Sequence, residues 1–335
     1  MRWSSATLVG FLAALWAVGG SNPAAGTDFD PWSEAARYEL EYRLELDPLA
    51  NAGPGEARLW VPLPSDTTYQ RVLARRVEAP WRHRLTRDRH GNAFVYLERG
   101  SAAPGGVLRL RFTVLRSPHR GVAQSSVRPG TPLDPSLYLS PQRKIPLQGT
   151  IRKIAEKQAA GLETDEQKVR AFYDYVVEHM RYSKEGQGWG EGDAIWACTR
   201  KYGNCTDFHS LFIGMARSQG ISARFVIGYP LPAESDEGQV RGYHCWTEVF
   251  VPRRGWLPLD ASEAKKSGRK DAYFGRLPSD RVEFTVGRDL VLEPPQRGEP
   301  LNYAIYPYAE VDGKPFDTLP WTLRYRRLPP EAARR

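Results

Sequence analysis

Hydrophobic and polar residues alternate in short runs through the first third of the chain. Between Ala36 and Asp47 the alternation is strict, with tyrosine or leucine at every second position and charged residues between them. A period of two predicts a β-strand that buries one of its faces. Further strands, separated by glycine, proline and asparagine turns, are predicted at residues 56–63, 70–77, 93–98 and 107–115.

Several short strands at this spacing favour a two-sheet sandwich of the immunoglobulin-like type, which we expect at residues 34–117. Between Ser117 and Pro146 the composition changes to proline, serine, glycine and arginine with weak periodicity. We therefore expect residues 118–146 to form a linker that runs over the surface. The sandwich region shows no grouping of side chains that indicates catalysis.

The hydrophobic period becomes helical after the linker. Thr164 and Gln167 form a capping-box pattern before a strongly amphipathic run, which predicts a helix that begins there. A second helix is predicted to begin at Cys205, with Asn204 as N-cap and Gly220 as the C-terminal cap. Its apolar positions recur at three and four residues and form one stripe: Phe208, Leu211, Phe212 and Met215.

Two strands joined by a tight turn are predicted after this helix. Alternation along the strand 243–251 places His244 on one face and Cys245 on the other, away from the histidine. If the hairpin is symmetric about Pro252, His244 lies directly opposite Asp260 on the second strand. We therefore expect Asp260 to accept a hydrogen bond from the imidazole.

A cysteine, a histidine and an aspartate thus come from one helix and two strands. A thiol is nucleophilic only as the thiolate, which a helix N-terminus and a neighbouring base favour. Cys205 begins the helix and has His244 as its candidate base, while Asp260 would fix the imidazole tautomer. Each residue alone also fits a structural role, as a small buried hydrophobe, a core histidine or a turn aspartate. Their order on these elements indicates a catalytic triad.

The sequence motifs of this region follow one another in a recognisable order: Gly203-x-Cys205, then Gly220 to Arg224, then His244-x-Trp246-x-Glu248, then Gly255-Trp256 and Asp260. Over residues 160–265 the chain resembles the transglutaminase-like superfamily, whose core is papain-like. The resemblance implies a catalytic triad of Cys205, His244 and Asp260 and acyl transfer through a thioester. It leaves the acceptor open, because the superfamily includes crosslinking enzymes, peptidases, peptide N-glycanases and members that have lost catalysis.

A glycine-rich loop at residues 182–192 precedes Cys205, and loops beside a nucleophile often shape a substrate cleft. In the superfamily an aromatic side chain upstream of the cysteine can help to hold the oxyanion. The resemblance therefore makes three upstream aromatic residues candidates for the oxyanion site: Tyr182, Trp189 and Trp196. Trp246, downstream in the His244 motif, is a fourth candidate for the oxyanion site or the cleft wall. Aromatic packing is the alternative role for each of them.

Three cysteines leave at least one unpaired. A Cys198–Cys245 disulfide would leave Cys205 free, a Cys198–Cys205 disulfide would inactivate it reversibly, and free thiols are the third arrangement. A zinc site that combines Cys205, His209, His244 and Cys245 is an alternative to catalysis. Because His244 and Cys245 point to opposite faces of one strand, we expect no metal. No cofactor motif is visible, and none is expected.

The first 25 residues have the layout of a cleavable secretory signal. They contain Arg2, an apolar run from Ala6 to Val18, and small residues at the end. The run is shorter than the about 20 residues that a membrane-spanning helix needs. We expect a periplasmic or secreted protein with no transmembrane segment in the mature chain; an uncleaved anchor is the alternative.

Charge and length add little to this picture. The formal net charge is +8, and apart from Arg324 to Arg327 no compact basic run is present, so nucleic acid is not an expected partner. A protein or peptide substrate, including an anionic component of the cell envelope, fits better; a solvated basic surface is the plain alternative. Oligomeric state stays open. The length predicts two domains, with a catalytic core at residues 147–270 and a β-rich extension at 271–335 packed on that core.

The sequence thus predicts an α+β chain, with an immunoglobulin-like sandwich before a papain-like, transglutaminase-like core. The predicted activity is that of an exported cysteine enzyme that opens amide bonds of protein or peptide substrates through a thioester. Water as acceptor makes it an amidase or peptidase, and an amine makes it a crosslinking enzyme. A binding or scaffold module that keeps the fold without catalysis is the alternative.

Overall fold

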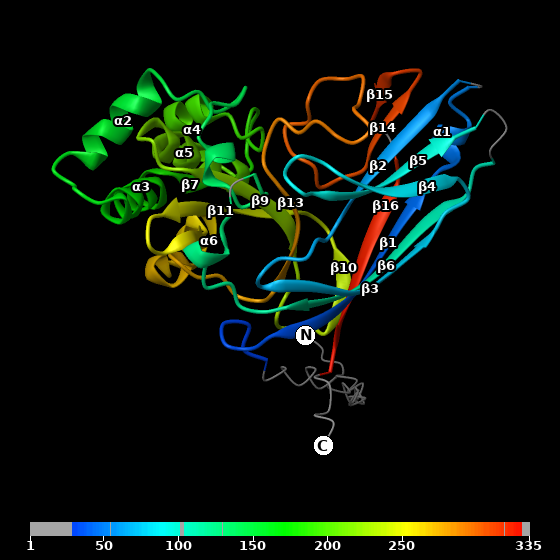
Figure 1. Cartoon of the computed structure of the whole chain (residues 1–335), viewed down its shortest axis with the longest axis horizontal. Helices are drawn as coiled ribbons and strands as arrows, with labels where there is room; N and C mark the ends of the chain where they lie inside the picture. The colour runs from blue at the N-terminus through cyan, green and yellow to red at the C-terminus, as the bar shows by residue number, and fades with distance from the viewer. Residues whose placement is uncertain (1–28, 54, 101–103, 129, 318, 330–335) are drawn as a thin grey trace, which may run out of the picture.

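A computed structural model describes residues 29–53, 55–100, 104–128, 130–317 and 319–329. The predicted signal at residues 1–25 lies outside the described residues. Figure 1 shows two parts side by side, a group of helices on the left and long strands on the right. Strands β9 (Ala223–Pro230), β11 (His244–Val251) and β13 (Arg281–Val286) lie between them. The chain is therefore α+β, as the sequence predicts.

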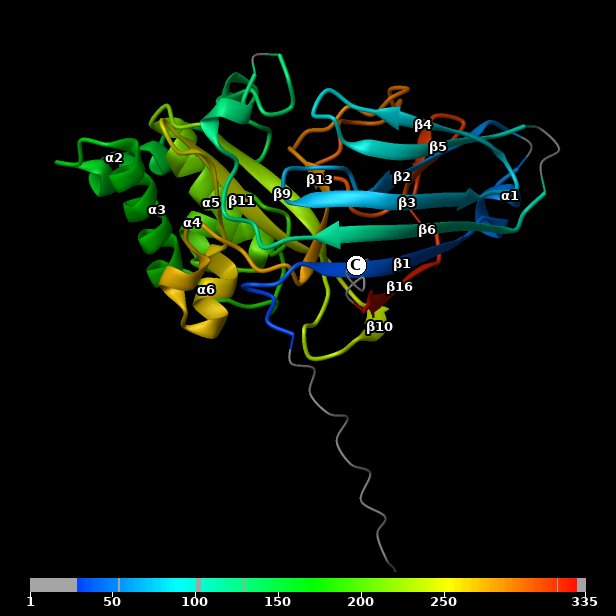
Figure 2. The same cartoon turned by 60° about the horizontal axis from the view of Figure 1, so that its bottom comes forward.

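The strands on the right form two five-stranded antiparallel sheets, with the orders β10-β16-β1-β6-β3 and β15-β14-β2-β5-β4. Figure 2 shows β1, β6 and β3 running side by side away from the helices. The bounds are β1 Ala36–Glu45, β2 Ala57–Leu63, β3 Gln70–Glu78, β4 Arg82–Arg87, β5 Ala93–Arg99, β6 Val107–Arg116, β10 Glu237–Val240, β14 Tyr308–Val311, β15 Lys314–Phe316 and β16 Trp321–Leu328, with a short helix α1 at Asp47–Ala50. The likeness to immunoglobulin domains stays a prediction.

The five predicted strands of this region are confirmed to within two residues at each end, whereas β4 was missed. Its sequence is RHRLTR, and its side chains are mostly exposed at the edge of the second sheet. An edge strand with charged side chains lacks the hydrophobic alternation from which strands are predicted.

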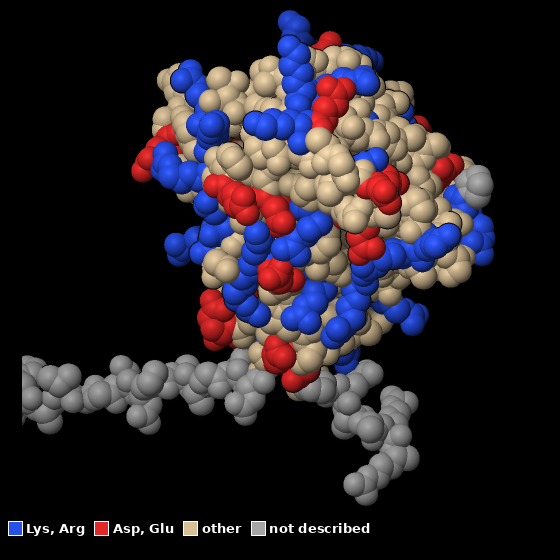
Figure 3. Space-filling view, turned by 90° about the vertical axis from the view of Figure 1, so that its left-hand side faces the viewer, with Lys and Arg blue, Asp and Glu red and all other residues tan. Residues whose placement is uncertain are grey.

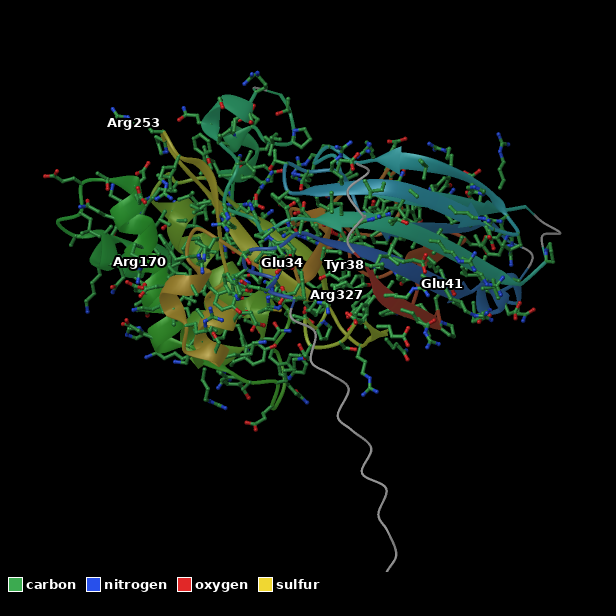
Figure 4. All side chains as sticks on the ribbon, turned by 90° about the horizontal axis from the view of Figure 1, so that it is seen from below. Glu34, Tyr38, Glu41, Arg170, Arg253 and Arg327 are labelled. Atoms are coloured by element: carbon green, nitrogen blue, oxygen red, sulfur yellow. The ribbon has the colours of Figure 1, made fainter. Side chains whose placement is uncertain are left out.

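The prediction of a C-terminal extension packed on the core is wrong for its last strands. β16 pairs with β1 along its whole length, so that Tyr38 lies opposite Arg327, and these two side chains are close together in Figure 4. β14 pairs with β2, and β10 pairs with β16. Each of these pairings joins residues far apart in sequence, which local periodicity does not reveal. Among the described strands of the extension, β13 alone joins the core sheet, beside β9.

The core consists of a four-stranded sheet, β12-β11-β9-β13, and the helices around it. The predicted capping box at Thr164 is confirmed, because the side chains of Thr164 and Gln167 bond to each other's backbone N–H groups. The remaining elements are α2 Thr150–Ala159, α3 Asp165–His179, β7 Arg181–Tyr182, α4 Ala194–Arg200, β8 Tyr202–Gly203, α5 Cys205–Ser218, β12 Gly255–Leu259 and α6 Ala261–Ser267, with short 3-10 turns at Gln124–Ser126, Pro135–Tyr138 and Lys270–Tyr273.

Helix α5 is the centre of the core. It packs against α2, α3, α4 and β11, and its residues from Cys205 to Arg217 are buried. The helix begins at Cys205 with Asn204 as N-cap, and Gly220 follows its end with a φ of 75°, as the sequence predicts. A long buried helix under a sheet supports a side chain at its N-terminus rigidly.

The segment 118–146 packs against the core through β-bridges. His119 pairs with Leu277, and Val122 pairs with Trp256. The side chains of His119, Val122 and Tyr138 are buried. The weak hydrophobic periodicity of this segment thus reflects an irregular backbone that packs against the core.

A buried polar cluster joins the sandwich to the core. The Tyr69 hydroxyl lies 2.6 Å from Glu248 Oε1 and also contacts Glu283. His119 Nε2 lies 2.9 Å from Glu248 Oε1, and Arg224 donates from Nε and Nη2 to Glu248 Oε2 at 2.9 and 2.6 Å. Burial lowers the pKa of His119 to about 4 and raises that of Glu283 to about 7. Glu248 and Arg224 are therefore the charged pair of this cluster.

We expect Gly228→Ala to destabilise the fold by about 1–3 kcal/mol, the range for overpacking a tight interior. Gly228 lies on β9 opposite His244, and a Cβ there would lie 1.9 Å from the carbonyl oxygen of Val282 on β13. Gly242→Ala is the matched control, because a Cβ at that position meets nothing within 4 Å. Urea unfolding of both variants measures the difference, and equal midpoints would contradict the prediction.

Candidate active site

The N-terminus of α5 holds Cys205 by an interlocked set of hydrogen bonds. Asn204 Oδ1 accepts from the Thr206 N–H at 2.9 Å, and Asp207 Oδ2 accepts from the Asn204 N–H at 2.9 Å. Asp207 also accepts from the backbone N–H groups of Gly190 and Gly192, at 2.7 and 3.0 Å. The first turn of the helix therefore fixes the glycine-rich loop beside the cysteine, and its N–H groups favour negative charge there.

His244 and Asp260 are joined by the hydrogen bond that the sequence predicts. His244 Nε2 lies 2.6 Å from Asp260 Oδ2, and both side chains are buried. Asp260 caps the N-terminus of α6, where its Oδ1 accepts from Ser262 Oγ and from the Glu263 N–H, both at 2.9 Å. This cap orients the carboxylate, so that Oδ2 faces the imidazole.

The predicted strand register around this pair is wrong by two residues. Val251 pairs with Gly255 and Thr247 with Leu259, so Asp260 is displaced along the hairpin from the position opposite His244. A shift of two residues leaves each side chain on its original face, and diagonal neighbours on one face stay within reach. The predicted hydrogen bond therefore forms in spite of the different turn, in which Arg253 has a φ of 70°.

Cys205 and His244 are close enough for each to shift the pKa of the other. Burial by itself raises the pKa of the thiol, but hydrogen bonds from Cys245 and His244 and the imidazole charge outweigh it and bring the pKa well below its usual value. Burial lowers the pKa of His244, but the charge and hydrogen bond of Asp260 outweigh burial and raise that pKa to about 10. Between these two values the pair is a thiolate and an imidazolium.

The expectation that Cys245 lies away from this chemistry is wrong. Its Sγ lies 3.5 Å from His209 Nδ1 and donates to Thr206 Oγ1 at 3.8 Å, so it meets the residue that follows Cys205. Helix α5 covers the face of β11 that carries Cys245, so this side chain meets the first turns of the helix. His244 is the first residue of β11 and reaches Cys205 from the end of the strand.

Asp260 has two further buried neighbours whose contacts sequence reasoning missed. Arg281 on β13 donates from Nη1 to Asp260 Oδ2 at 2.9 Å, and His209 Nε2 lies 3.5 Å from Asp260 Oδ1. Burial raises the pKa of Asp260, but the charge of His244 and the neighbouring donors outweigh it and hold the pKa well below its usual range. The sequence singled out His209 only as a possible zinc ligand with Cys205, whereas no local pattern points to Arg281.

The three cysteines form no disulfide with one another in the structure. Cys198, Cys205 and Cys245 are all free and buried. Across the described ranges, no group of three or more histidine, cysteine, aspartate or glutamate side chains is arranged to hold a metal ion.

The four aromatic candidates separate into different surroundings. Tyr182 lines a cleft together with His244. Trp246 is fully buried, since β11 is an inner strand of the core sheet, so its predicted place in the cleft wall is wrong. Trp196 packs edge-on against Tyr202, with ring centroids 5.1 Å apart, and the Lys184 ammonium lies 6.0 Å from the ring of Trp189. Of the four, Tyr182 is the one that the structure places beside the imidazole.

The cleft at His244 has a volume of about 500 Å³. Tyr243, which sequence reasoning did not single out, lines it and is tied to the helix start: its hydroxyl accepts from Asn204 Nδ2 at 3.1 Å and bonds Thr206 Oγ1 at 2.8 Å. The charged residues around the cleft are Lys184, Arg241, Glu263 and Lys266. Figure 3 shows that the helical face of the molecule carries cations and anions interspersed, without a large patch of one sign.

A cysteine at the N-terminus of a buried helix, with a histidine and an aspartate delivered by the adjoining sheet, defines a papain-like α+β core. Residues 152–261 match the model of the transglutaminase-like superfamily, and this core belongs to that superfamily. Within the residues that the structure covers, no helix combines the length and the apolar character needed to cross a membrane.

Individual proteins similar to this chain extend the comparison beyond the core. An uncharacterized protein of Haemophilus influenzae is 25% identical over 329 residues, which cover 85% of this chain and 89% of that protein. The uncharacterized protein YebA of Bacillus subtilis is 27% identical over 127 residues, 34% of this chain and 17% of YebA. The crystal structure of a proposed cysteine protease from Cytophaga hutchinsonii has a TM-score of 0.59 at 17% identity and covers 90% of this chain and 93% of that one. That likeness shows a shared fold, sandwich included.

Proposed function

We propose that the chain is a cysteine enzyme that opens amide bonds of protein or peptide substrates through a thioester on Cys205. The observation that carries the proposal is the buried hydrogen bond between His244 and Asp260, together with a cysteine at a helix N-terminus whose thiol pKa is lowered by His244. The thiolate attacks the amide carbonyl carbon, and the Cys205 N–H at the start of the helix donates to the oxyanion in this proposal. The His244 imidazolium then gives its proton to the leaving amine, and a thioester remains.

The second half of the reaction uses the same residues. His244, now neutral, accepts a proton from a water or an amine as that group attacks the thioester carbon, and Cys205 leaves as the thiolate. Water gives an amidase or peptidase reaction and an amine gives a crosslink, so the acceptor is decided by the cleft and not by the triad. We expect this activity outside the cytoplasm, on the basis of the signal-like residues 1–25.

The direct test is iodoacetamide labelling of reduced protein across pH, read by peptide mass spectrometry. Labelling of Cys205 is expected to have its midpoint well below the about 8.5 of a free thiol, and His244→Ala should move the midpoint to that value or above. His179→Ala is the matched control, because His179 is an exposed residue of α3 that bonds only the Tyr175 carbonyl among the described residues. An ordinary thiol profile in wild-type protein would favour the binding-module alternative.

The pH dependence of turnover follows from the same pair. Acyl transfer rises as Cys205 ionises, and it falls as His244 loses its proton, because the leaving amine then has no acid. The pKa of about 10 for His244 therefore places the alkaline limb near that pH.

Hydrolysis and transamidation are separated by ammonia release from glutamine peptides, with and without an added primary amine. Turnover without the amine indicates hydrolysis, and turnover that requires the amine indicates transamidation.

A further inference from the structure

The cleft beside His244 carries more cations than anions. The charged side chains that line it are Lys184, Arg241, Glu263 and Lys266. Glu263 and Lys266 contact each other as an ion pair, so their charges cancel. Lys184 and Arg241 have no anionic partner among the described residues. Two positive charges are therefore left unbalanced in the cleft, and the proposed mechanism gives them no role.

The two unbalanced cations come from different parts of the fold. Lys184 follows β7, which pairs with β8 just before α5, and the neighbouring Ser183 N–H donates to the Gly203 carbonyl at 2.9 Å. Arg241 follows β10, the end strand of the sheet β10-β16-β1-β6-β3, and precedes His244 on the way to β11. Paired strands thus fix the backbone beside each cation, while both side chains are exposed. The cations can therefore meet a ligand in the cleft.

The catalytic groups do not offset this positive charge. Cys205 and His244 are neutral as a pair, whether they are a thiolate and an imidazolium or a thiol and an imidazole. The Asp260 carboxylate is paired with the Arg281 guanidinium at 2.9 Å, so these two charges also balance. A cleft with an excess of one sign raises the local concentration of ligands of the opposite sign, because its low-dielectric walls focus the field. The cleft therefore attracts anions.

The anionic groups that a peptide offers are carboxylates. An arginine guanidinium has N–H donors that match a carboxylate, and a lysine ammonium binds one as a point charge. The cleft of about 500 Å³ contains both cations and the His244 imidazole. A carboxylate that reaches Lys184 or Arg241 therefore belongs to a residue near the amide that reacts.

We propose that the cleft selects acidic peptides, and that Lys184 and Arg241 determine this specificity by binding carboxylates beside the reacting amide. The inference rests on the proposed function, in which Cys205 attacks that amide. The two cations bind parts of the substrate that do not change in the reaction, so they hold the ground state and the transition state alike. Their removal should therefore raise KM more than it lowers kcat.

Two alkylating reagents of similar size but different charge test the cleft without a known substrate. Iodoacetate is an anion and iodoacetamide is neutral, and both react with the Cys205 thiolate. A change in the pKa of Cys205 therefore cancels in the ratio of their rates, which is read at the Cys205 peptide by mass spectrometry. Lys184→Gln and Arg241→Gln should each lower the ratio of the iodoacetate rate to the iodoacetamide rate by about 1.5- to 5-fold, the range for an exposed charge pair. Arg241→Lys keeps the charge and should keep most of the ratio.

Lys157→Gln and Arg82→Gln are the matched controls. Lys157 lies on α2 and Arg82 on β4; both are exposed, and neither forms an ion pair with any residue that the structure describes. They change the net charge of the protein by the same amount as the cleft variants, but away from the cleft. His244 is present in every variant, so its own attraction for iodoacetate cancels in the comparison.

Peptides that protect Cys205 from iodoacetamide test the substrate class directly. The three peptides have one length and a central glutamine, with glutamate, glutamine or lysine on both sides of it. The acidic peptide should protect wild-type protein at the lowest concentration. Its advantage over the neutral peptide should shrink in the double variant Lys184→Gln, Arg241→Gln and at a salt concentration of about 1 M, where the Debye length is about 3 Å.

The possible results separate this inference from the proposed function. A lower rate ratio in the cleft variants, together with the best protection by the acidic peptide, supports the inference. A low labelling midpoint of Cys205 with the same ratio in the cleft variants and wild type overturns it and leaves the proposed function intact. An equal fall of the ratio in the control variants assigns the effect to net charge and also overturns it, as does equal protection of wild-type protein by the three peptides. An ordinary thiol profile of wild-type Cys205 overturns both proposals.

Discussion

Asp260→Asn is expected to slow acylation of Cys205 by an amide substrate by about 10⁴-fold, as loss of the orienting carboxylate does in triad enzymes. The neutral amide no longer stabilises the imidazolium, and His244 can adopt the tautomer in which Nε2 is bare and Nδ1 cannot accept the thiol proton. The hydrogen bond of 2.6 Å between His244 Nε2 and Asp260 Oδ2 is the contact that the substitution weakens.

Asp280→Asn is the matched control for this experiment. Both Asp260 and Asp280 contact Arg281, at 2.9 Å from Nη1 and 3.2 Å from Nε respectively, but only Asp260 also contacts the imidazole. Both variants therefore remove a negative charge beside Arg281, whereas only Asp260→Asn also removes the charged partner of the His244 imidazole. Single-turnover acylation at fixed pH measures the effect, with circular dichroism as a check of folding. Equal rates in the two variants would remove Asp260 from the mechanism.

The site lies where several elements that are distant in sequence pack against one another. Helix α5 supplies Cys205 and His209, β11 supplies His244 and Cys245, and Asp260 caps α6 where β12 ends. Arg281 reaches the carboxylate from the edge strand β13. Buried neighbours on every side leave little freedom for these groups, which is the condition for preorganised catalysis.

Local signals in the sequence were sufficient to predict that a helix begins at Cys205 and that His244 forms a hydrogen bond with Asp260. Capping residues and amphipathic stripes act within a few residues, so they can be recognised without knowledge of the fold. The hairpin register was wrong by two residues, because turn geometry and not hydrophobicity sets it. The error was harmless only because an even shift keeps the face of each side chain.

Contacts between distant segments could not be predicted in this way. β16 completes the sheet beside β1, nearly 300 residues earlier in the chain, and its own alternation is compatible with any sheet that has a free edge. Cys245 was excluded from the site by strand alternation alone, which gives the face of a side chain but not the element that covers it. Since α5 covers that face, the excluded residue lies 3.8 Å from Thr206, the residue after the nucleophile.

Glu248 lies four residues along β11 from His244, at the junction between the core and the sandwich. Its carboxylate contacts Tyr69, His119 and Arg224, and all four side chains are buried. Tyr69 contacts Glu283 as well and has a single hydroxyl proton, so it donates to one of the two carboxyl groups. Glu283, with its pKa raised to about 7 by burial, is the group that can carry the other proton.

Glu248→Gln is expected to lower the free energy of unfolding by about 3–5 kcal/mol, because Arg224 is then a buried cation without its counter-charge. Glu156→Gln is the matched control: Glu156 pairs with Arg152 on α2, both side chains are about half exposed, and loss of such a pair costs about 0–1 kcal/mol. Adding Arg224→Met to the Glu248 variant should recover part of the loss, since no unpaired charge stays buried. Urea unfolding of the four proteins measures these differences. If Glu248→Gln unfolds within 1 kcal/mol of wild type, the junction is held by apolar packing and the ion pair contributes little.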